Sequence, residues 1–330
     1  MKHAIDFRNR DIPIAGLLYL PDGFDAAASY AALVIATPGS SVKEQIGAIY
    51  AAKLAAQGFV VLTFDPSCQG ESGGKPRDLE DPALRVEDLR CAVDCLVTLP
   101  YVDETRLGVL GICAGGGYAI AAALTEHRFR AVGTVVASDI GRSFRRMQSR
   151  EALLQTLADV GRQRTAEARG RAPRRDPWIP DRLAEAHAAG VDDPDVLAAV
   201  AFYREPPHRH PNAHNRLLFT SFGAVLGFDG FHLVPELLVQ PLQVVVGGRR
   251  GSTGQYEAGQ TLFELAPNPA NGFCVVDGAG HYDLYHVPAY VDAAIATLAP
   301  FYAAHLGDRR RDAPPGGTVA SPGPPLDAGD

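Results

Sequence analysis

The chain has 330 residues, 46% of them apolar and 21% charged, which is enough for one large α/β domain with an insertion or for two ordinary domains. Its formal net charge of −7 leaves no basic excess, which argues against nucleic acid as a partner. No run approaches the roughly 18 apolar residues of a transmembrane helix, and the first residues lack the apolar core of a signal peptide, so we expect a cytoplasmic protein with no membrane partner.

Short apolar runs alternate with amphipathic stretches, the order expected of a parallel sheet with helices on both faces. The predicted elements are, in chain order, a hairpin (about 3–8 and 13–20), strand 32–37, helix 43–57, strand 59–64, helix 83–98, strand 106–111, helix 115–126, strand 131–137, strand 242–246, helix 256–266, strand 272–277 and helix 288–305. The expected fold class is therefore α/β, with a mostly parallel central sheet flanked by helices.

Between the sixth and seventh predicted strands, Arg-rich and Ala-rich helical segments replace the strand signals. We interpret residues 142–235 as a helical cap inserted into a core that comprises 1–141 and 236–306. The arginines of this cap either lie on solvated helix faces or bind a phosphate-bearing acyl carrier. Residues 307–330, rich in proline and without periodicity, are predicted to form a disordered tail.

A nucleophile turn is indicated at Cys113, between an apolar strand and a helix of small residues. The turn reads Gly-x-Cys-x-Gly, in which Gly111 and Gly115 let the neighbouring backbones pass without a Cβ clash. The N–H groups and the positive dipole end of the helix that starts at Ala114 favour a thiolate at Cys113. The alternative is a buried structural cysteine. Five cysteines, an odd number, favour free thiols over a disulfide framework.

His281 is the strongest candidate for the base that a cysteine nucleophile needs. It follows the last predicted strand and is preceded by Gly280, so we expect it on a flexible loop that reaches back over the turn. The oxyanion of a tetrahedral intermediate requires two backbone N–H donors. We expect one from Ala114 and the other from Ser40, in the loop after strand 32–37.

The run from Phe64 to Gly74, the stretch from Leu107 to Tyr118 and the segment around His281 resemble the α/β-hydrolase superfamily. Within it they are similar to the dienelactone hydrolase-like group that includes fungal polyketide transferases. The resemblance covers about 1–306 and is weakest through the cap. It implies the α/β-hydrolase fold, a Cys or Ser nucleophile at the turn, a His base, and cleavage of an ester, lactone or thioester or transfer of its acyl group.

The chain departs from the family at the third member of the triad. The family's acid normally follows the strand that here is 242–246, but that loop contains no Asp or Glu before Glu257. Three explanations stay open. The acid has moved to Asp139, after strand 131–137; or Cys113 and His281 form a thiolate–imidazolium pair before substrate arrives and need no acid; or the scaffold no longer catalyses hydrolysis.

Two further acids fall in the same motifs. The resemblance implies that a glutamate near the oxyanion loop helps to activate the thiol, and Glu44 is the candidate. Glu44 also suits the start of helix 43–57, where it would complement the helix dipole. We interpret Asp65 as structural, anchoring the turn of residues 70–73.

The sequence thus predicts an enzyme in which Cys113 attacks the carbonyl of a small-molecule acyl substrate and His281 serves as base and acid. No cofactor and no metal is expected, because neither a phosphate loop nor a ligand cluster is present in the sequence. An acyl carrier protein and a second copy of the chain, as a homodimer, are further candidate partners. The alternatives are a lyase or cyclase without a covalent intermediate and a catalytically silent binding protein.

Overall fold

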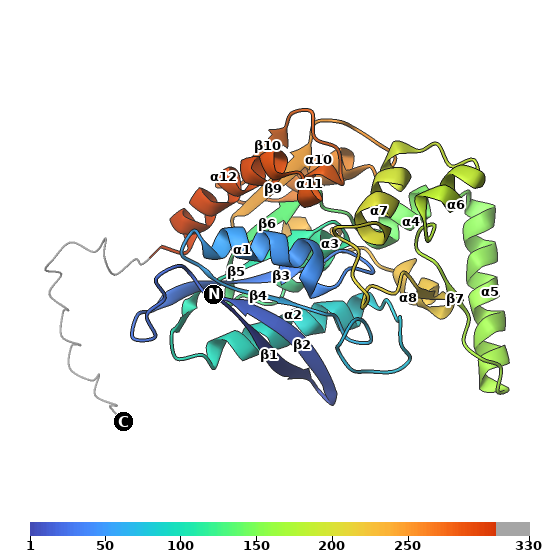
Figure 1. Cartoon of the computed structure of the whole chain (residues 1–330), viewed down its shortest axis with the longest axis horizontal. Helices are drawn as coiled ribbons and strands as arrows, with labels where there is room; N and C mark the ends of the chain where they lie inside the picture. The colour runs from blue at the N-terminus through green and yellow to red at the C-terminus, as the bar shows by residue number, and fades with distance from the viewer. Residues whose placement is uncertain (308–330) are drawn as a thin grey trace, which may run out of the picture.

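The computed structural model describes residues 1–307, so the predicted tail lies, from residue 308 on, outside the described residues. Eight strands form one sheet in the order β1-β2-β4-β3-β5-β6-β9-β10 (Figure 1). The two pairs that involve β2 are antiparallel and the other neighbouring pairs are parallel, which confirms the expected α/β class. The strands are β1 (Lys2–Asn9), β2 (Ile12–Tyr19), β3 (Tyr30–Ala36), β4 (Val60–Phe64), β5 (Val102–Ile112), β6 (Phe129–Val135), β9 (Leu242–Gly247) and β10 (Gly272–Val276).

Helices cover both faces of the sheet, because successive side chains of each strand point to opposite faces. In β3, Val34 belongs to the core cluster on one face, whereas Leu33 and Ile35 belong to the cluster on the other. The first cluster includes α2 (Pro82–Val97), α3 (Ala114–Ala123) and α10 (Gln255–Leu265), and the second includes α1 (Ala48–Ala55) and α12 (Pro288–His305).

One predicted helix, 43–57, is split. Residues Lys43–Gly47 form a short π-helical turn, η1, in which Gln45 has a non-helical ψ of −123°, and α1 begins only at Ala48. Two side-chain acceptors hold this turn: Asp65 accepts from the backbone N–H of Lys43 at 2.7 Å, and Gln45 accepts from that of Val42 at 3.2 Å. Because these contacts replace a regular first turn, the prediction of one continuous helix is wrong here.

The segment between β6 and β9, residues 136–241, is mostly helical and is called the insertion below. It comprises α4 (Ile140–Arg146), α5 (Arg150–Ala168), α6 (Leu183–Ala188), α7 (Pro194–Arg204), α8 (Phe222–Val225), α9 (Val234–Leu237) and a strand pair, β7 (Arg175–Asp176) with β8 (Leu217–Leu218). The strand pair was not predicted, because two residues are too few to show a strand period. Figure 1 shows α4, α5, α6, α7 and α8 gathered at one side of the sheet, with α5 outermost. In residues 1–307 we find no helix with the length and apolarity needed to cross a bilayer.

The start of α3 packs unusually close to β3 and β5. A Cβ atom added to Gly115 would meet the carbonyl oxygen of Ala36, and one added to Gly111 would lie 2.5 Å from the Cα of Gly116. These contacts confirm the reason for which the sequence predicts glycine at both positions: the turn at Cys113 exists only where the backbones can approach this closely.

We expect Gly115→Ala to lower the free energy of unfolding by about 1–3 kcal/mol, because the new methyl group overpacks the contact with Ala36. The matched control is Gly161→Ala on α5, where no heavy atom lies within 4 Å of the added Cβ. There we expect a gain of up to about 1 kcal/mol from helix propensity. Urea titrations of both variants check this, and equal stabilities would contradict the packing argument.

Candidate active site

Cys113 forms a strained turn between β5 and α3. Its φ of 54° and ψ of −124° lie in a region that non-glycine residues rarely occupy. The turn is held on both sides of Cys113: its N–H donates to the carbonyl of Val135 at 3.1 Å, and its carbonyl accepts from the N–H groups of Gly116 at 2.8 Å and Ser138 at 2.9 Å. The predicted strand–turn–helix context is therefore present, and it presents the thiol to the space beyond the strand ends.

His281 lies after β10 and is buried, with 2% of its surface exposed. Its Nε2 is 3.1 Å from the hydroxyl of Tyr285, and that hydroxyl also hydrogen-bonds the Cys113 side chain. Tyr285 belongs to the short helix α11 (Asp283–His286) and is itself fully buried. Among residues 1–307 no direct hydrogen bond joins Cys113 to His281. A phenol therefore stands between the two residues that the sequence predicts as a pair.

Burial favours the uncharged forms of both Cys113 and His281. Burial raises the pKa of the Cys113 thiol, although the hydrogen bonds of Tyr285 and of the Ala114 N–H act in the opposite direction. Burial also lowers the pKa of His281 to about 3. Both shifts favour the uncharged forms of the two groups. The explanation by a thiolate–imidazolium pair stays a prediction.

The two expected oxyanion donors line one cavity with Cys113. The N–H of Ala114 hydrogen-bonds the Cys113 side chain, and Ser40 has a positive φ of 59° in the loop that follows β3. That loop is fixed from behind, because the buried Arg85 donates to the carbonyl of Thr37 at 2.5 Å. Arg85 thus anchors the start of the loop that carries Ser40.

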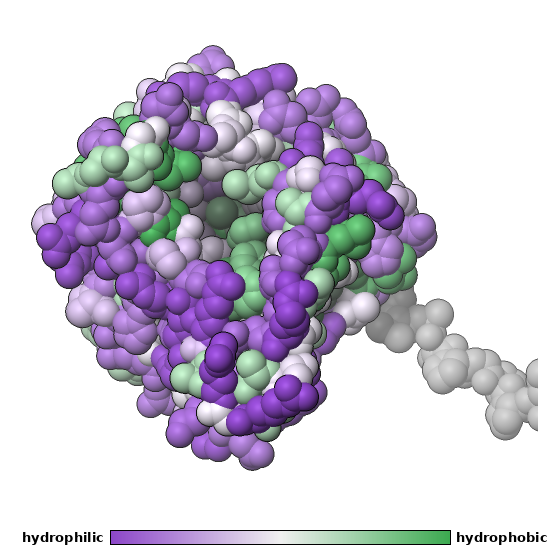
Figure 2. Space-filling model, turned by 90° about the vertical axis from the view of Figure 1, so that its right-hand side faces the viewer, coloured by the Kyte–Doolittle hydropathy of each residue, from purple (hydrophilic) through white to green (hydrophobic). Residues whose placement is uncertain are grey.

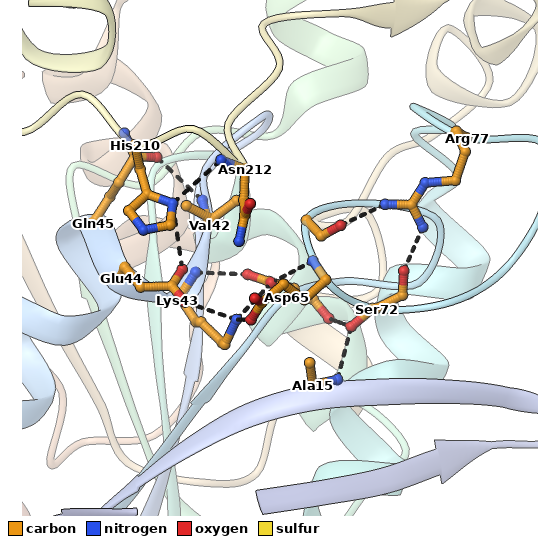
Figure 3. A network of polar contacts seen from close by, with 12 residues as sticks. Ala15, Val42, Lys43, Glu44, Gln45, Asp65, Ser72, Arg77, His210 and Asn212 are labelled. Atoms are coloured by element: carbon orange, nitrogen blue, oxygen red, sulfur yellow. Dashed lines mark hydrogen bonds and ion pairs between the residues drawn. The ribbon is translucent and has the colours of Figure 1, made fainter. Parts of the chain in front are cut away.

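Beside this loop, the buried Lys43 binds three carboxylates (Figure 3). Its Nζ lies 2.9 Å from Asp65, 2.8 Å from Glu44 and 2.5 Å from Glu71. Asp65 also accepts from the N–H of Glu71 at 2.8 Å, and its carbonyl accepts from the Ser72 hydroxyl at 2.6 Å, which confirms that it anchors the turn of residues 70–73. Glu44 has no contact with the thiol, so the structure assigns it to this network and not to thiol activation.

The same network reaches the insertion (Figure 3). His210 faces Glu44 at 3.9 Å, and the side chain of Gln45 donates to the carbonyl of His208 at 3.0 Å. Nearby, His214 faces Asp78 at 3.5 Å. Within residues 1–307 no group of three or more His, Cys, Asp or Glu side chains is arranged to hold a metal ion. These histidines therefore connect the insertion to the core.

Asp139 does not complete a triad. Its carboxylate accepts from the N–H of Arg142, at the start of α4, and from the N–H of Gly230 farther along the insertion. Meanwhile Nδ1 of His281 is buried and has no hydrogen-bond partner among residues 1–307. The expectation that Asp139 supplies the acid is thus corrected: α4 begins directly after Asp139, and the helix start uses the carboxylate as its N-cap.

Cys113 and His281 open into a cavity of about 300 Å³ with largely apolar walls. The face of the molecule that carries the insertion is hollowed, with hydrophobic residues around the hollow and hydrophilic ones on its rim (Figure 2). Trp178 packs against the backbone of Gly39 in the oxyanion loop, and Ile140, Phe144 and Ile179 extend the apolar wall. This volume suits an acyl chain of moderate length.

The helix α7 of the insertion contributes a face to this cavity. Asp195, Val196, Ala199 and Tyr203 line it, at spacings that share one side of a helix. Tyr203 is hydrogen-bonded to Tyr285 and so extends the chain of hydroxyls at the thiol. The sequence prediction missed these four residues, and only their helical spacing could have indicated that they share a face.

Comparisons with known proteins bear on the family and the fold of the chain. A family model described as PET hydrolase-like matches residues 14–166. The uncharacterized protein YcjY of Escherichia coli is 36% identical over 310 residues, which span 92% of this chain and 98% of YcjY. The thiohydrolase aneE of Aspergillus aculeatus is 27% identical over 263 residues, 78% of this chain and 79% of aneE. The crystal structure of the hypothetical protein PA2218 from Pseudomonas aeruginosa superposes with a TM-score of 0.82 at 30% identity, covering 92% of this chain and 94% of that chain.

We expect Tyr285→Phe to slow alkylation of Cys113 by iodoacetamide at pH 8 by roughly tenfold, because the lost hydrogen bond no longer lowers the pKa of the thiol. The matched control is Tyr282→Phe, since the Tyr282 ring packs on the same imidazole at 4.7 Å between centroids. Mass spectrometry of the alkylated peptide measures the rate. Identical rates in wild type and Tyr285→Phe would refute the connecting role of the phenol.

The pKa of His281 also predicts how stability depends on pH. Below the ordinary histidine pKa of about 6.5 the unfolded chain binds a proton at His281, whereas the folded chain does so only near pH 3. Stability is therefore lost as the pH falls from 6.5 toward 3, by a few kcal/mol for this group. Urea titrations at several pH values give the free energy of unfolding of wild type and of His281→Gln. The two curves of this free energy against pH should converge or cross in this window, because glutamine does not titrate. Parallel profiles would contradict the burial of a neutral imidazole.

Proposed function

This chain belongs to the α/β-hydrolase superfamily, and we propose that it is a cysteine-dependent hydrolase or acyltransferase that cleaves a thioester, ester or lactone through an acyl-enzyme at Cys113. The observation that carries the proposal is the thiol on a strained turn, connected through Tyr285 to His281 at the base of an apolar cavity. The similarity to a thiohydrolase supports a thioester as the first substrate class to test.

Acylation begins from the neutral site. As Sγ of Cys113 attacks the carbonyl carbon, its proton passes to the Tyr285 oxygen while the phenolic proton passes to Nε2 of His281, so the phenol ends neutral. The carbonyl oxygen becomes the oxyanion, and the N–H groups of Ala114 and Ser40 stabilise it. We place proton transfer together with attack, because burial raises the pKa of the thiol and so disfavours a free thiolate.

The tetrahedral intermediate then collapses. The imidazolium of His281 gives its proton to the leaving thiolate or alkoxide, and an acyl group remains on Cys113. Neutral His281 next takes a proton from water or from an acceptor alcohol as that oxygen attacks the acyl carbon. Return of this proton to Sγ releases the acid or the new ester and restores the thiol.

Intact-protein mass spectrometry after incubation with hexanoyl-N-acetylcysteamine tests this function. We expect one added hexanoyl group on Cys113, no adduct on Cys113→Ala, and an adduct on His281→Ala that clears at least about 10²-fold more slowly, because no base activates water. The control is Cys274→Ala, since Cys274 lies on β10, away from the residues that line the cavity.

Turnover by Cys113→Ala at the wild-type rate would instead establish a reaction without a covalent intermediate at Cys113, as the lyase or cyclase alternative requires. Absence of any adduct in wild type, together with ordinary alkylation of Cys113, would overturn the proposal in favour of a binding protein.

A further inference from the structure

The proposed base, His281, lacks an orienting carboxylate in the loop after β9, where the resemblance of the chain to α/β-hydrolases predicts one. Nδ1 is buried without a hydrogen bond in the described part of the chain. A histidine that accepts a proton at Nε2 becomes an imidazolium, whose Nδ1–H then needs an acceptor. The loop after β9, residues 248–254, contains no acid.

A carboxylate from the insertion occupies that loop instead. Asp195, in the first turn of α7, is 8% exposed, and its Oδ2 accepts from the N–H of Thr253 at 3.1 Å. Its carboxylate also fills the space that a side chain at position 251 would need, so that Gly251 is required there. A residue of the insertion thus places its charge where the loop itself has none.

Asp195 also lies near the residues that surround the imidazole of His281. It lines the same cavity as His281 and Tyr282. Tyr282 packs on the imidazole, with ring centroids 4.7 Å apart. Burial, first of all, and the nearby acidic groups, Asp195 among them, raise the pKa of Tyr282. The negative charge of Asp195 is therefore felt one ring away from the base.

Three other acids near this loop already have backbone or ion-pair partners. Asp139 accepts two backbone N–H groups at the start of α4 and in the insertion. Asp283 accepts from the N–H of Gly280 at 2.8 Å and pairs with Arg249 at 2.7 Å. Asp193 caps α7 by accepting from the N–H groups of Asp195 and Val196.

We propose that Asp195 is the positioning carboxylate of His281, supplied by the insertion in place of an acid in the loop after β9. This inference rests on the proposed function. In the resting site neutral His281 leaves Nδ1 unpaired. When the proton of Cys113 reaches Nε2, the Asp195 side chain stabilises the Nδ1–H side of the imidazolium. The helix α7 then contributes two side chains to the site, Asp195 from its first turn and Tyr203 from near its C-terminal end.

The test compares wild type, Asp195→Asn, Asp195→Glu and Asp192→Asn with hexanoyl-N-acetylcysteamine as substrate. Asp192 is the matched control, because it is an exposed acid just before the same helix. The measurements are kcat and KM against pH, clearance of the acyl adduct by mass spectrometry, and urea stability. Trp178, the only tryptophan of the chain, lines the cavity, so its fluorescence reports the Kd of the hexanoyl thioether analogue.

We expect Asp195→Asn to lower kcat about 10²-fold, less than the roughly 10⁴-fold that the same change costs a serine triad, because a thiol needs less activation. KM and the Kd of the analogue should stay within about threefold, since the substrate contacts are intact. The acidic limb of kcat/KM should shift to lower pH, because the imidazolium loses its neighbouring charge. Asp195→Glu should recover part of kcat, and Asp192→Asn should match wild type.

Equal kcat values for Asp195→Asn and Asp192→Asn would overturn the inference. So would an Asp195→Asn variant whose pH profile is unchanged and whose loss appears only in KM, in Kd or in urea stability. A purely structural contact would produce that second result. Failure of the proposed function is a separate result: wild type then forms no adduct on Cys113. An adduct that forms and clears in Asp195→Asn as it does in wild type refutes the role of Asp195 alone.

Discussion

The site depends on the close approach of α3 to β3 and β5. Because Gly115 lies directly against the carbonyl of Ala36, the chain turns at Cys113 within one residue, at a φ of 54°. The turn directs Sγ away from the sheet and places the N–H of Ala114 next to it. Backbone contacts to Val135 and Ser138 prevent the turn from relaxing. The strain is therefore distributed over three strands, a cost that only a well-packed sheet can carry.

Burial decides the chemistry that this turn performs. The insertion covers Cys113 and His281, and the resulting desolvation moves both pKa values toward the neutral forms. A cysteine protease with a standing ion pair needs little help from an acid. In the proposed mechanism the charge develops during the reaction, as it does with a serine nucleophile, so hydroxyls and carboxylates around the imidazole gain importance. Tyr285 connects the thiol to the base, and Tyr203 hydrogen-bonds that phenol from the insertion.

The sequence was sufficient for features set by local patterns and insufficient for those set by packing. The strands, the turn at Cys113 and the structural role of Asp65 follow from apolar periods and from the spacing of glycines, which act over a few residues. Asp139 was misassigned because a carboxylate after a strand serves equally as a helix N-cap, and only the N–H of Gly230, 91 residues away, decides between the roles. Nothing local marks Asp195, since Asp-Pro-Asp reads as an ordinary helix start.

The acids around the site divide by the surface on which they lie. On the core, Glu44 and Asp78 face His210 and His214 of the insertion. Asp139 lies within the insertion and accepts from the N–H of Gly230 farther along it. Glu44 and Asp78 therefore connect the insertion to the core, whereas Asp139 joins two parts of the insertion. Asp195 makes a contact across the same boundary from the side of the insertion, with the N–H of Thr253 in the loop after β9. The proposed active site is complete only when the insertion is docked, so the contacts of Glu44 and Asp78 support the proposed catalysis without touching the substrate.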